Sequence, residues 1–207
     1  MTTKQLVALE TSLLPELPGF AIKGWLMLLH PLGSLLRGIC FERSGFDKHA
    51  FYPNVFVMPL CVPTPHVTLN FGFRLRDQRG MDGWDIETPG VAGELLASIK
   101  AEAVPLQSRA NSLVEFVTLA RTFSPGTPHN PKAIGFALAR AGKVDEAIAA
   151  LAGIPRILDP KYSWQRELGE QTENLRELLI SNPAAAMQQL ETWEAETIHN
   201  LGLEDFR

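Results

Sequence analysis

The feature that most constrains the fold is a change of residue pattern near the middle of the chain. Between residues 20 and 75, apolar runs rich in Val, Ile, Leu and Phe are cut by Pro, Gly and Asp/Asn clusters, which is typical of short strands and turns. From residue 91 onwards the apolar residues recur at helical spacing, and prolines separate the segments. Runs of strands followed by runs of helices predict an α+β fold.

The first half is expected to form a four-stranded sheet behind an N-terminal helix at residues 2–14. The clearest alternation runs from Val67 to Leu75, where apolar residues alternate with polar or small ones, as in a sheet with one buried face. Because the connections are short, we expect the sheet to be antiparallel. The predicted strands are residues 21–29, 35–43, 54–62 and 67–75.

The second half is expected to be entirely helical. Asn130 and Asn182 are natural N-caps, and each precedes a proline that is tolerated in a first helical turn. We therefore divide the chain into a sheet region, residues 1–90, and a helical region, residues 91–207, with one continuous domain as the alternative. The predicted helices are residues 91–103, 107–122, 131–141, 144–152, 163–180 and 183–200.

Residues 134–151 read I-G-F-A-L-A-R-A-G-K-V-D-E-A-I-A-A-L and predict a hairpin of two helices. Gly142 can end the first helix in a left-handed conformation, while Asp145 and Glu146 complement the dipole of the second. Over residues 128–161 this hairpin resembles one tetratricopeptide repeat, a family of packing and partner-binding units. No neighbouring segment repeats the pattern, and a solenoid needs about three units. The hairpin is therefore either isolated and packed on the sheet or flanked by degenerate units.

The order of the first half provides a second resemblance. A helix, then P-G-F at residues 18–20, then strands ending in H-V-T-L-N-F-G-F-R-L at residues 66–75 resemble small α+β immunity-type proteins of bacterial toxin systems. The likeness covers residues 1–80. It implies a cytoplasmic protein that binds and neutralises a cognate toxin, and it assigns no functional residue.

Composition favours a soluble protein of a reducing compartment. The hydrophobic fraction of 45% is ordinary for a globular chain, and two cysteines are too few for a disulfide framework. Residues 1–16 lack the pattern of a secretory signal, and the apolar run at residues 24–36 is too short to cross a bilayer. We expect a cytoplasmic location and no membrane partner.

Motifs for catalysis, metals and nucleic acids are weak. Cys61 and His66 are the one candidate pair for a thiol enzyme, although a cysteine inside a strand is typically a core residue. The five histidines and the acidic loop at residues 77–90 lack the spacing of metal ligands, so we expect no cofactor. Three arginines at residues 74, 76 and 79 are too few to indicate nucleic-acid binding in a chain of net charge −4.

Protein binding is the function that the sequence favours, without catalysis. Large apolar groups in polar loops are the residue types that anchor interfaces, and residues 167–207 hold nine acidic against two basic side chains, which favours a basic partner surface. An immunity or antitoxin role fits best; the alternatives are a helical-repeat adaptor that holds a peptide and a small enzyme using Cys61 and His66. The candidate contact residues are Phe46, Phe51, Tyr52, Met81, Asp82, Trp84, Asp85, Glu191, Glu194 and Glu196.

Overall fold

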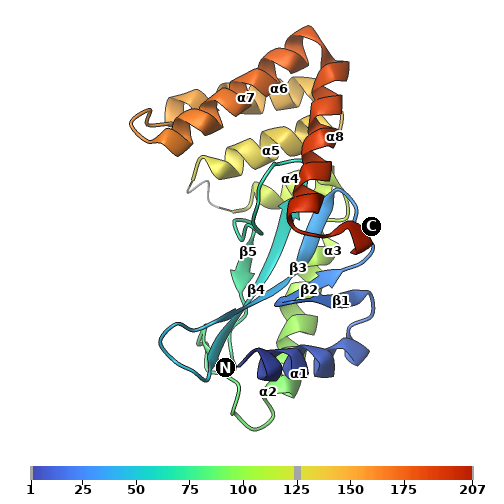
Figure 1. The fold of residues 1–207 in the computed structure, drawn as a ribbon, viewed down its shortest axis with the longest axis vertical. Helices are drawn as coiled ribbons and strands as arrows, with labels where there is room; N and C mark the ends of the chain where they lie inside the picture. Colours follow the sequence, from blue (N-terminus) through green and yellow to red (C-terminus); the bar gives the residue numbers. More distant parts are fainter. Residues whose placement is uncertain (1, 124–126, 207) are drawn as a thin grey trace.

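The computed structural model describes residues 2–123 and 127–206. The strands are β1 (Phe20–Lys23), β2 (Leu26–Leu29), β3 (Leu35–Arg43), β4 (Ala50–Pro59), β5 (Gly72–Arg74) and β6 (Trp84–Asp85). The helices are α1 (Thr3–Leu13), α2 (Val91–Ser98), α3 (Val104–Ser108), α4 (Leu113–Ala120), α5 (His129–Arg140), α6 (Val144–Ala152), α7 (Ser163–Ser181) and α8 (Pro183–Asn200). The sheet and α1 form one end of the molecule and α5 to α8 the other (Figure 1). The α+β prediction is confirmed.

The sheet is antiparallel, as expected, but it has six strands and not four. Strands β1 to β5 follow one another in order, and β6 pairs with the start of β4. The predicted strand at residues 21–29 is in fact a hairpin, because Gly24 takes a positive φ of 61° in a two-residue turn. A glycine at the first position of such a turn is what a tight hairpin requires.

The segment at residues 67–75 forms much less strand than its alternation predicted. Gly72–Arg74 pairs in register with β4. On either side, the Phe71 carbonyl accepts from the Val57 amide at 2.8 Å and the Leu75 amide donates to the Pro53 carbonyl at 2.9 Å. Val67 and Leu69 pack on one face of the sheet, whereas Phe71 and Leu75 belong to the core on the other. The chain therefore changes faces inside the predicted strand, and a regular ladder cannot continue through that change.

Two apolar layers cover the two faces of the sheet. The larger one joins α1 and the sheet to α2, α4 and the C-terminal helices, so it runs without interruption across residue 90. The smaller one holds Leu28, Cys40 and Phe56 beneath Ile198 of α8 and Leu203, which follows that helix. The sheet is thus covered by residues that lie far away in the sequence.

The helical half follows the predicted order, but two helix starts differ from the prediction. Helix α5 begins at His129, so Asn130 lies within its first turn and is not its N-cap. Residues 91–108 form α2 and α3 joined by a π-helical turn at Ile99–Ala103, and the predicted helix at 107–122 begins only at Leu113. Ser112 explains that start, since its hydroxyl accepts a hydrogen bond from the Glu115 amide at 3.2 Å as an N-cap. Among the described residues, no helix is both long and apolar enough to cross a membrane.

The hairpin at residues 134–151 is present as α5 and α6. The helices approach closely at Gly135, where an added Cβ would lie 2.3 Å from a methyl carbon of Leu151. Gly142 ends α5 with a φ of 74°, as the sequence predicted. The likeness to a tetratricopeptide repeat stays a prediction.

Candidate functional site

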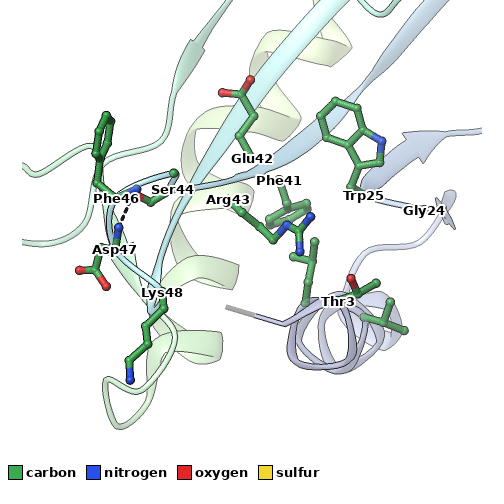
Figure 2. A pocket seen from close by; sticks show the side chains of 13 residues that line it. Thr3, Gly24, Trp25, Phe41, Glu42, Arg43, Ser44, Phe46, Asp47 and Lys48 are labelled. Atoms are coloured by element: carbon green, nitrogen blue, oxygen red, sulfur yellow. Dashed lines mark hydrogen bonds between the residues drawn. The ribbon is translucent and has the colours of Figure 1, made fainter.

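A surface groove lies between the N-terminal half of α1, the β1–β2 turn and the far end of the β3–β4 ribbon (Figure 2). Its volume is about 970 Å³. Leu6 and Phe41 form its buried apolar floor, and Val7, Trp25 and Phe46 are exposed around it. Grooves with exposed aromatic groups at their edges are typical of surfaces that bind other molecules.

Phe46 lies at the tip of the β3–β4 hairpin and is fully exposed. The tip is held by its own hydrogen bonds: the Ser44 hydroxyl accepts from the Phe46 and Asp47 amides at 3.2 and 3.1 Å, and the Asp47 carboxylate accepts from the His49 amide at 2.8 Å. Because these bonds already order the backbone of the turn, binding a partner at Phe46 would cost little further backbone entropy.

Trp25 occupies the second position of the β1–β2 turn and is 50% exposed. Its carbonyl accepts a hydrogen bond from the Phe41 amide at 2.9 Å. This is the last backbone bond between β3 and the β1–β2 hairpin. Backbone groups alternate in direction along an antiparallel strand. Since the Ser44 amide bonds to Ala50 on the β4 side at 3.0 Å, the backbone N–H and C=O of Arg43 point to the opposite, unpaired side.

The charges around this edge are arranged asymmetrically. Arg43 projects from β3 towards α1, whereas Glu42 points away from it (Figure 2). The Glu42 carboxylate accepts from the Asn54 amide at 2.9 Å and lies 3.6 Å from the Arg74 guanidinium. Within residues 2–123 and 127–206, no carboxylate pairs with Arg43. The groove therefore offers an unpaired cation beside an unpaired strand edge.

Two of the aromatic residues predicted to contact a partner lie in the core instead. Phe51 and Trp84 are 0% and 2% exposed, and their ring centroids are 6.4 Å apart. The Trp84 ring nitrogen donates to the Leu75 carbonyl at 2.9 Å. Phe51 belongs to β4 and Trp84 to β6, so pairing of these strands turns both rings into the sheet's larger core.

The other predicted loop residues are scattered. Tyr52 is half-buried, and the Arg74 guanidinium lies over its ring, with the guanidinium carbon 4.8 Å from the ring centroid. Asp82 pairs with Arg76 at 3.0 Å, and Asp85 accepts from the Glu87 amide at 2.9 Å. Met81 is exposed, but it does not line the groove. Of the predicted loop residues, the groove contains Phe46 alone.

The three glutamates predicted on α8 do not form one free acidic face. Glu194 is buried and lies 3.1 Å from the Arg140 guanidinium, and Glu191 lies 3.7 Å from it. These two carboxylates join α8 to α5. Glu196 is exposed. Two of the three carboxylates therefore form ion pairs within the chain.

Among the described residues, no hydrogen bond joins Cys61 to His66, and the two side chains differ in burial. Cys61 is fully buried, whereas His66 is exposed. Burial, with a smaller effect from Glu194, raises the pKa of the Cys61 thiol to about 12, which opposes thiolate formation at neutral pH. In the part of the chain that the structure describes, no three His, Cys, Asp or Glu side chains cluster as metal ligands.

Sequence reasoning missed Trp25, Arg43 and Val7, which lie together at the groove. Gly24 was the available signal, because a glycine within an apolar run marks a turn and places the next residue outside the sheet. Comparison of the chain with protein families, curated proteins and solved structures finds no match.

Proposed function

We propose that this protein binds another protein without catalysis, and that an extended segment of the partner fills the groove beside β3. Phe46 carries the proposal, because a fully exposed aromatic ring on a hydrogen-bonded hairpin tip gains most by burial in a partner. The unpaired edge at Arg43 supports addition of a strand, a recurring way of binding extended peptides.

The partner segment is proposed to carry a carboxylate opposite Arg43, since that guanidinium forms no ion pair with any carboxylate of the described residues. The sequence predicted a basic partner from the acidic balance of residues 167–207. Two of those acids, Glu191 and Glu194, pair with Arg140 within the chain. Neutralisation of a toxin is one form of such binding and stays a prediction.

The test is photo-crosslinking from position 46 in cells, followed by titration of the purified captured protein against the full chain. Phe46→Ala and Trp25→Ala should each weaken binding at least ~10-fold. Tyr162→Ala, at an aromatic residue of the helical half that is 55% exposed, close to the value for Trp25, is the control and should leave the affinity unchanged. An unchanged Kd for the Phe46 and Trp25 variants would refute the proposal.

A further inference from the structure

A second, smaller cavity lies where the segment after β4 meets the first turn of α5. Its volume is about 150 Å³, and it shares no lining residue with the groove. His129 and Lys132 line one side, and the opposite chain segment contributes Thr64, Thr68 and Asn70. None of the described residues that line it is an aspartate or a glutamate.

Lys132 is the unusual residue of this cavity, because it is 7% exposed and pairs with no carboxylate of the described residues. Its ammonium donates to the Gln171 side-chain carbonyl and lies 5.2 Å from the centroid of the Phe136 ring. Burial lowers the pKa of the amine to about 8. A buried cation is costly unless an anion compensates it.

The surroundings would also favour a negative ligand. The cavity adjoins the N-terminal end of the 12-residue helix α5, which is the positive end of its dipole. The His129 ring is held by stacking on Trp164, with centroids 5.3 Å apart. Burial and then Lys132 lower the pKa of His129, which keeps the ring neutral and able to donate one N–H at pH 7.

We propose that this cavity binds a small oxyanion, a carboxylate or a phosphate, through charge-assisted hydrogen bonds from Lys132. The Thr68 hydroxyl and the Asn70 amide have no partner within the described chain and complete the set of donors. Since a water molecule takes about 30 Å³ of liquid, the cavity has room for an ion of several heavy atoms but not for a nucleotide.

The experiment titrates the full chain with phosphate and, separately, with acetate, each against sodium chloride at equal ionic strength. The expected result is saturable binding of one or both ions, seen as a rise in Tm and as shifts of the Thr68 and Ala133 amide signals in NMR spectra. Comparison of the two ions identifies whether a phosphate or a carboxylate is preferred.

Lys132→Met keeps the apolar stem and removes the charge, so the affinity for the anion should fall at least ~10-fold. Lys143→Met, which removes an exposed lysine, should not change it. The proposal is overturned by an equal affinity in Lys132→Met, or by the absence of saturable shifts in the unmodified protein, a measurement that does not require any variant to fold.

Discussion

At the scale of single residues, Glu10 of α1 is the most exceptional side chain in the core. It is 0% exposed, and neither carboxylate oxygen has a hydrogen-bond partner among the residues described. Burial raises the pKa of this carboxyl from the ordinary value of about 4.5 to about 7. Between these two values the folded state keeps a proton that the unfolded state has released, so stability falls as the pH rises through this window.

We therefore expect the unfolding free energy of the parent protein to fall by about 1 to 3 kcal/mol between pH 5 and pH 8, and that of Glu10→Gln not to show this fall. Urea unfolding of both proteins at each pH measures the difference. Glu170→Gln, at an exposed position of α7, should leave the pH dependence unchanged. A Glu10→Gln protein whose stability changes with pH as steeply as the parent would show that this carboxyl does not titrate as described.

The aromatic residues show which side-chain positions could be predicted from the sequence and which could not. Phe46, Phe51 and Trp84 all stand among polar neighbours in the sequence, and all three were predicted to contact a partner. Burial separates them, because β6 pairs with β4 across more than thirty residues and carries Phe51 and Trp84 into the core. No local pattern encodes that pairing. Only the ring in the hairpin tip remains exposed.

At the scale of elements, the free edge of β3 provides a test of how the groove binds. The Arg43 N–H points away from β4, so a proline there would remove a donor from the groove without breaking the β3–β4 ladder. Arg43→Ala is the matched control, because it removes the same side chain and keeps the N–H. If strand addition operates, Arg43→Pro should bind the crosslinked partner at least ~5-fold more weakly than Arg43→Ala. Equal affinities would mean that the groove binds through side chains alone.

Local signals also explain which elements could be predicted. The helices at 144–152 and 183–200 match their predicted ranges, since caps and prolines near their ends act within a few residues. The prediction of a strand at 67–75 was wrong in length, because that length depends on pairing with β4 and on the two apolar clusters that the segment contacts. The groove could not be predicted for the same reason: it is formed where α1, the β1–β2 turn and the β3–β4 hairpin meet.

At the scale of the whole molecule, the shared core makes the two halves depend on each other. Buried residues of the sheet, α2, α4 and the C-terminal helices form one cluster, and the end of α8 covers the opposite face of the sheet. The Thr197 hydroxyl of α8 also donates to the Val62 carbonyl at 3.3 Å. The prediction of two regions divided at residue 90 would cut this cluster, so we expect the alternative, one cooperative unit.

Leu151→Ala tests this cooperativity from the helical side. Leu151 is 0% exposed beside Gly135, and its truncation should cost about 2 to 5 kcal/mol. In one cooperative unit, the opening free energy measured by amide hydrogen exchange should fall by the same amount at Ile39 in β3 as at Leu175 in α7. Ile180→Ala, at a 58% exposed position, should alter neither amide. If Ile39 kept its full protection while Leu175 lost it, the sheet and the helices would unfold as separate domains, because the contacts across residue 90 would then be too weak to couple them.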